Sequence, residues 1–158
     1  MMLTVESVLA GQLLRHANEV RRLALAATQG RYSWLEQYLR GRTEATGLLR
    51  EVVTNHGWPT YWLVGATASD AALYLLLEAT ALHFQRQCRE LIAAAVAGGL
   101  TPPGHLTCID HVISVASGEP PRYAGHPRSF RSPAPVSPSS AGGRQAPPKT
   151  TRMEGVAS

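Results

Sequence analysis

Residues 55–59 read Asn-His-Gly-Trp-Pro, residues 63–65 read Leu-Val-Gly, and a long helical pattern then runs over residues 68–97. Glycine allows a helix to end in a turn of positive φ, and proline fixes the backbone of the turn that follows. Tryptophan supplies a large apolar side chain that fills a gap between helices. These motifs predict a helix that ends near His56, a short connection and a helical hairpin behind it.

The part of the chain before these motifs has a helical pattern as well. Apolar residues recur at steps of three and four from Val5, which predicts a first helix that ends near Gly30. Ser33 and Glu36 form a capping box at the start of a second helix. Gly41 should end or kink this helix before a third helical segment begins.

The sequence that follows these motifs predicts two or three more helices. Thr67 and Asp70 are a plausible cap for the long run, which should break near Thr80. Thr101 should cap a last helix that ends at Gly118. We expect this helix to bury a stripe formed by Leu106, Ile109, Val112, Ile113 and Ala116. Because no alternating strand pattern stands out, the predicted fold class is all-α, a single small bundle of about five helices.

Charge and proline content divide the chain in two. Residues 1–118 contain nine arginines and nine acidic residues, so the net charge of +4 lies in the remainder. Eight of the eleven prolines lie at or after Pro120, among Ser, Gly, Ala and Arg. A segment with so few large apolar residues cannot bury enough surface to offset the entropy of ordering it. We therefore expect a helical domain over residues 1–123 and a disordered, basic Pro/Ser-rich tail over residues 124–158.

Several classes of protein are disfavoured by these patterns. The neutral body has no basic stripe interleaved with aromatic residues, which argues against a specific nucleic-acid partner. Cys88 and Cys108 lack the spacing of a disulfide framework. The start of the chain carries Glu6 and no basic lead into an apolar run, which argues against a signal peptide. The most apolar run, residues 71–77, is too short to span a bilayer. We expect a cytoplasmic protein without a membrane partner.

Short motifs between about residues 42 and 126 follow one another in a recognisable order. They are Leu49-Arg50-Glu51-Val52-Val53, His56-Gly57-Trp58-Pro59, Leu63-Val64-Gly65, Ala71-Ala72, Phe84-Gln85, Asp110 with Val112, and Arg122-Tyr123. In these motifs the chain resembles a family of small, uncharacterised bacterial proteins, a domain of unknown function. The resemblance implies no known activity.

The departures from this family fall on polar positions. Where the family has Gln-His-Ala-Asp, residues 77–80 read Leu-Glu-Ala-Thr, and an Asp and an Asn that often precede the first match read here as Arg42 and Ala45. The family's Gly-Thr-Gln ending reads Ala-Gly-His at residues 124–126. The resemblance therefore implies a divergent member that keeps the framework and has lost the polar residues of any family site. Failure of the changes Glu78→His and Thr80→Asp to restore binding would weaken this hypothesis.

The central motifs supply five candidate site residues: His56, Gly57, Trp58, Pro59 and Gly65. Packing alone accounts for Trp58 and Pro59, and the two glycines suit helix ends. His56 can bond the last carbonyls of its helix, interact with the helix dipole, or shuttle a proton. Because the first two roles need no substrate, we favour a structural interpretation of this motif.

The last predicted helix carries three possible metal ligands. His105, Cys108 and His111 recur at steps of three and so occupy an arc of about 120°. That arc is too wide to close easily on one zinc ion. We expect Cys108 to be a small core residue and the histidines to lie at the rim or surface, and we predict no metal and no cofactor.

Two classes of function remain. The favoured one is a non-catalytic binding or interaction module that contacts an unknown protein partner or a second copy. Its surface would be formed by Trp34, Tyr38, Trp58, Tyr61 and Trp62, unless these residues are core. The alternative is a weak or degenerate hydrolase-like enzyme with a polar pocket between helices. That pocket would comprise Glu78, Gln85, Asp110 and Tyr123.

Overall fold

The computed structural model describes residues 4–30 and 32–119. This part of the chain is all helical and contains no strand, which confirms the predicted fold class. Its helices are α1 (Val5–Ala27), α2 (Tyr32–His56), α3 (Tyr61–Val64), α4 (Ala66–Glu78), α5 (Leu82–Ala97) and α6 (Pro103–Ser117). The predicted tail over residues 124–158 lies outside the described residues.

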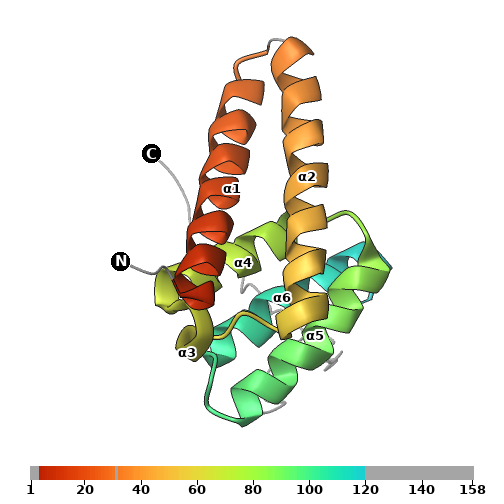
Figure 1. Cartoon of the computed structure of the whole chain (residues 1–158). Helices are drawn as coiled ribbons and strands as arrows, with labels where there is room; N and C mark the ends of the chain where they lie inside the picture. Colours follow the sequence, from red (N-terminus) through yellow and green to blue (C-terminus); the bar gives the residue numbers. More distant parts are fainter. Residues whose placement is uncertain (1–3, 31, 120–158) are drawn as a thin grey trace, which may run out of the picture. The chain divides into compact units, whose positions relative to one another are not determined.

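The helices form one bundle around a shared core. α1 and α2 make a long antiparallel hairpin, and α4 packs against both of them, while α5 and α6 pair with each other (Figure 1). The side chains buried at the centre come from α1, α2, α4, α5 and α6, and they include Leu13, Leu49, Leu76, Ile92 and Ile109. Within the described residues, no helix has the length and apolar content required to cross a membrane.

The second helix differs from its prediction in two ways. α2 continues through Gly41, so the expectation that this residue ends the helix was wrong. A Cβ atom at Gly41 would lie 2.9 Å from Leu23 Cδ1, which means that the glycine lets α1 and α2 approach closely. α2 begins at Tyr32, so Ser33 lies inside the helix and is not its cap.

The connection between α2 and α4 has the geometry expected of its residues. α2 ends at His56, and Gly57 follows with a φ of 75°. Trp58 is 5% exposed and Pro59 is fully buried. Gly65, with a φ of 81°, separates α3 from α4. These features support the structural interpretation of the motif, because each residue turns the chain or fills the core.

The later helix ends were predicted less accurately. α4 begins at Ala66, so Thr67 lies inside it and does not cap it with Asp70. The break between α4 and α5 does fall at Thr80. α6 begins one residue later than predicted, and Pro102 rather than Thr101 is its N-cap. The predicted stripe on α6 is only partly right, since Ile109 is buried but Ala116 is exposed, whereas His105 and Ser114 are buried.

Two glycine substitutions should change stability in opposite directions. Gly47 lies in the middle of α2 with open space around its Cβ position, so Gly47→Ala should raise the free energy of unfolding by about 0.5–1 kcal/mol. Gly57 has a positive φ, so Gly57→Ala should lower that free energy by about 1 kcal/mol. Urea denaturation of both variants checks the pair. Equal effects of one sign would contradict the assigned backbone geometry.

Candidate functional site

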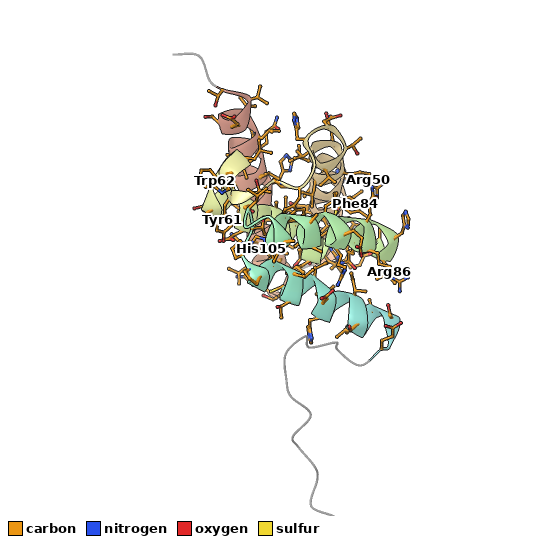
Figure 2. All side chains as sticks on the ribbon, turned by 90° about the horizontal axis from the view of Figure 1, so that it is seen from below. Arg50, Tyr61, Trp62, Phe84, Arg86 and His105 are labelled. Carbon is orange, nitrogen blue, oxygen red and sulfur yellow. The ribbon has the colours of Figure 1, made fainter. Side chains whose placement is uncertain are left out.

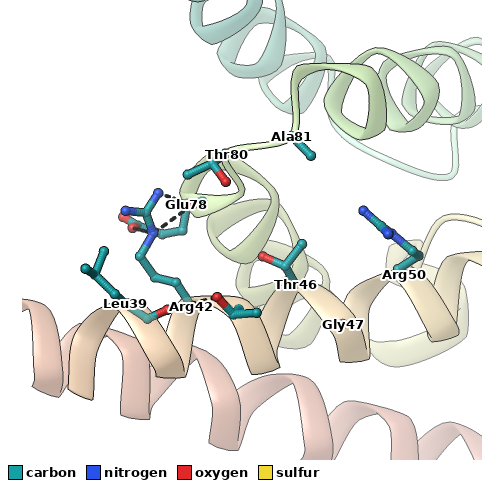
Figure 3. A pocket seen from close by; sticks show the side chains of 9 residues that line it. Leu39, Arg42, Thr46, Gly47, Arg50, Glu78, Thr80 and Ala81 are labelled. Atoms are coloured by element: carbon teal, nitrogen blue, oxygen red, sulfur yellow. Dashed lines mark hydrogen bonds and ion pairs between the residues drawn. The ribbon is translucent and has the colours of Figure 1, made fainter. Parts of the chain in front are cut away.

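A cleft lies between the middle of α2 and the connection from α4 to α5 (Figure 3). Its volume is about 430 Å³. It brings together two guanidinium groups, one carboxylate and three threonine hydroxyls. The lining residues are Leu39, Arg42, Thr43, Thr46, Gly47, Arg50, Glu78, Thr80 and Ala81. Of the four residues predicted to form a polar pocket, Glu78 is the one found here.

Arg42 connects the two sides of the cleft. Its Nε and Nη2 atoms donate hydrogen bonds of 3.0 and 2.6 Å to the backbone carbonyl of Glu78, the last residue of α4. Its Nε also lies 3.5 Å from Glu78 Oε2, and its guanidinium lies 5.2 Å from the ring centroid of Tyr38. A cation at a helix C-terminus satisfies a carbonyl that the helix leaves unpaired. Arg42 therefore fixes the end of α4 against α2.

The carboxylate of Glu78 is held from α2 as well. Tyr38 donates a 2.5 Å hydrogen bond to Glu78 Oε2. Burial, together with this hydrogen bond, raises the pKa of Tyr38 to about 12. A phenol is protonated at neutral pH even at its ordinary pKa, so Tyr38 is the donor of this hydrogen bond. Glu78 is an acceptor with two protein partners, which leaves it poorly placed to act as a free acid or base.

Arg50 is the second cation of the cleft, and its situation is different. Its guanidinium lies 5.1 Å from the ring centroid of Phe84 at the start of α5 (Figure 2). It forms no ion pair with any residue that the structure describes. Arg50 is exposed, so its N–H groups are open to a ligand.

The other residues of the predicted polar pocket have separate partners. Gln85 is buried, and its Nε2 donates to the carbonyls of Leu76 and Ala79, which holds the break between α4 and α5. Asp110 accepts a 2.8 Å hydrogen bond from Arg89 Nε. Neither residue lines the cleft that contains Glu78. Tyr123 lies outside the described residues.

A second polar cluster joins α3, α4 and α6, and the sequence did not reveal it. Asp70 Oδ1 accepts a 2.8 Å hydrogen bond from the Tyr61 hydroxyl and lies 2.9 Å from His105 Nε2. Because a carboxylate only accepts, the second hydrogen bond requires a proton on Nε2. His105 is 5% exposed, and its ring meets Tyr61 edge to face at 5.7 Å. The hydrogen bond to Asp70 raises the pKa of Tyr61.

The three residues weighed as metal ligands do not lie in one environment. His105 is buried, whereas Cys108 and His111 are exposed. The expectation of a core Cys108 and of histidines at the rim was therefore wrong for Cys108 and for His105. Residues 4–30 and 32–119 contain no group of three or more His, Cys, Asp or Glu side chains placed to hold a metal ion.

The two cysteines should differ strongly in reactivity. Burial raises the pKa of the Cys88 thiol to about 12, although Arg50 lowers it. The exposed Cys108 lacks this protection. Ellman's reagent at pH 8 should therefore label one thiol in the folded protein and two in denaturant. Labelling of two thiols at equal rates under native conditions would contradict the packing around α5.

The predicted aromatic surface does not form as one patch. Trp34 and Tyr38 lie in the first half of α2, whereas Tyr61 and Trp62 belong to α3, beyond the other end of α2. Trp58 is buried in the core. Trp62 is 82% exposed. The five aromatic residues therefore lie in three places: Trp58 in the core, Trp34 and Tyr38 part-buried on α2, and Tyr61 and Trp62 on α3.

Comparisons of the chain with protein-family models, with curated proteins and with solved structures found no match.

Proposed function

We propose that the protein is a non-catalytic binding module whose α2 cleft recognises a carboxylate group of its ligand. The proposal rests on one observation about Arg50. This arginine lines the cleft and has no carboxylate partner among the described residues. The hydroxyls of Thr46 and Thr80 line the same cleft and make no hydrogen bond within the described part of the chain. A guanidinium with neighbouring hydroxyl donors suits a carboxylate, because its paired N–H groups match the two oxygens.

The composition of the cleft favours binding over chemistry. Its nine lining residues include no histidine, cysteine, serine or lysine. Its carboxylate, Glu78, is already engaged by Tyr38 and Arg42. A threonine hydroxyl acts as a nucleophile only when an adjacent base activates it, and the one carboxylate that lines this cleft is already bonded to Tyr38 and paired with Arg42.

The family resemblance supports the same cleft. Arg42, Glu78 and Thr80 stand where that family has Asp, His and Asp, and all three line the cleft, whereas Ala45 and Leu77, which also depart from the family, do not. Positions far apart in the sequence therefore share one site. On this proposal, the Arg42–Glu78 pair occupies positions where that family has other polar residues, and Arg50, which belongs to a motif the chain shares with the family, binds the ligand.

Succinate binding by Arg50 variants tests the proposal. In ligand-observed NMR with the full-length protein, succinate should bind, and Arg50→Gln should weaken binding about tenfold through loss of one charge-assisted contact. Arg86→Gln is the matched control, because Arg86 is an exposed arginine that lies on α5 and donates to Ser117 (Figure 2). Equal weakening by both variants, or none by Arg50→Gln, would contradict a cleft-specific site.

A further inference from the structure

α2 carries a stripe of exposed residues along one face of the helix, and this face includes the α2 side of the cleft. They recur at steps of four and three along the helix, within an arc of about 80° and over about 33 Å. The stripe, here called the outer stripe, consists of Tyr32, Glu36, Leu39, Thr43, Gly47, Arg50 and Thr54. Leu39, Thr43, Gly47 and Arg50 also line the cleft.

The spacing of the outer stripe is the same when read from either end. Its steps are four, three and four on each side of Thr43. If two copies of α2 pack antiparallel around a two-fold axis at Thr43, each residue of the stripe faces another residue of the same stripe. Glu36 then faces Arg50, and Leu39 faces Gly47.

The facing residues complement one another in charge. Glu36 and Arg50 are both exposed, and neither forms an ion pair with a described residue of its own chain. In the antiparallel arrangement each copy contributes one of each, so two opposite-charge pairs form. Such pairs set partner choice and orientation between helices.

The facing residues also complement one another in size. Leu39 is 49% exposed, so its apolar side chain is available to a second copy. Gly47 has nothing within 4 Å of its Cβ position, so the leucine of a second copy can pack over it. A glycine inside a helix weakens that helix. Close approach of a second helix would give Gly47 a structural role, because a glycine leaves room for the other chain.

The shape of the bundle leaves the first half of the outer stripe clear of the later helices, and the second half borders the cleft. The first half of α2 extends past α4, α5 and α6, with α1 alongside it (Figure 1). Thr43 lies near the middle of α2, so a two-fold axis there places the α3–α6 parts of the two copies at opposite ends of the helix pair. Tyr32, which is 77% exposed, adds apolar surface at the edge of the contact.

We infer that the chain forms an antiparallel dimer through the outer stripe, in which Glu36 of the second copy supplies a carboxylate to Arg50 in the cleft. This inference rests on the proposed function, because it names the carboxylate that the cleft recognises. A second copy fits better than an unrelated apolar helix, since an apolar surface would leave both Glu36 and Arg50 without partners. A contact between two helices is smaller than a standard interface of about 800 Å² per partner, so we expect a dissociation constant in the micromolar range or weaker.

Charge reversal in the full chain tests the pairing. In sedimentation equilibrium over a wide concentration range, Glu36→Arg and Arg50→Glu should each weaken the dimer at least tenfold. The double variant should restore it, because the two pairs re-form with reversed polarity. Arg86→Glu serves as the control and should leave the dimer unchanged. A monomer at all concentrations, or a dimer that tolerates both single reversals, would overturn the inference.

A disulfide cross-link tests the position of the two-fold axis without changing a charge. In a Cys108→Ser background, Thr43→Cys should form an intermolecular disulfide under mild oxidation, because this position faces itself across the axis. Thr54→Cys is equally exposed on α2 but faces Tyr32, so it should stay reduced. Equal cross-linking of both variants would contradict the axis. Succinate and Glu36 of the second copy compete for Arg50, so succinate should weaken the dimer. If succinate still binds through Arg50 while no dimer forms, the proposed function stands and the dimer alone is refuted.

Discussion

Replacing Trp58 by alanine should lower the free energy of unfolding by about 3–5 kcal/mol, a large share of the 5–15 kcal/mol typical of a small domain. Trp58 is 5% exposed and belongs to the core cluster, at the connection that joins α2 to α3. Removing its side chain leaves a cavity beneath the helices that meet there. Urea denaturation, read from the shift in midpoint at an unchanged slope, measures the effect.

The neighbouring tryptophan gives a matched control for this prediction. Trp62 is 82% exposed, so Trp62→Ala should change stability by less than about 0.5 kcal/mol. The two variants delete the same side chain four residues apart. Similar costs for both would show that Trp58 does not fill the core as described.

Replacing His105 by alanine should lower the free energy of unfolding by about 2–4 kcal/mol. The side chain is buried, and its removal deletes the hydrogen bond to Asp70 and the edge-to-face contact with Tyr61. These contacts join α6 to α4 and to α3. Urea denaturation again provides the measurement, with hydrogen exchange to show whether the α6 amides lose protection.

Two conservative variants separate the contributions of His105. His105→Phe keeps the ring contact with Tyr61 and removes the hydrogen bond, so it should cost less than His105→Ala. Asp70→Asn keeps an oxygen that accepts from both partners, and Asp70 is 58% exposed, so the cost should be below about 1 kcal/mol. A larger loss for Asp70→Asn than for His105→Ala would place the stabilising contact elsewhere.

The helices were predictable because local pattern decides them. Apolar steps of three and four defined α1, and the residues around Thr80 marked the break between α4 and α5. The errors arose where tertiary packing overrides a local signal. Gly41 has the propensity to end a helix, yet the close approach of Leu23 from α1 keeps it inside α2. Ser33 and Thr67 have side chains typical of helix caps, but α2 begins at Tyr32 and α4 begins at Ala66, one residue before each of them.

The site was less predictable, because its contacts join residues far apart in the chain. Arg42 and Glu78 are 36 residues apart, and Asp70 and His105 are 35 residues apart. No periodicity reports such pairs. In the sequence, Glu78 stands out because it departs from a family pattern, whereas Arg50 is part of a framework motif. The proposed role of Arg50 depends on its lack of a carboxylate partner among the described residues. Only the three-dimensional structure reveals whether an arginine has such a partner.

The side-chain NMR spectrum of the arginines during a succinate titration of the full-length protein shows directly whether the α2 cleft binds a carboxylate. We expect the Nε–Hε resonance of Arg50 to shift with succinate concentration and to saturate. The resonance of Arg42 should move little, because its donors are already bonded to Glu78. An unchanged Arg50 resonance, or a shift that Arg86 shares equally, would contradict the claim that the α2 cleft recognises a carboxylate.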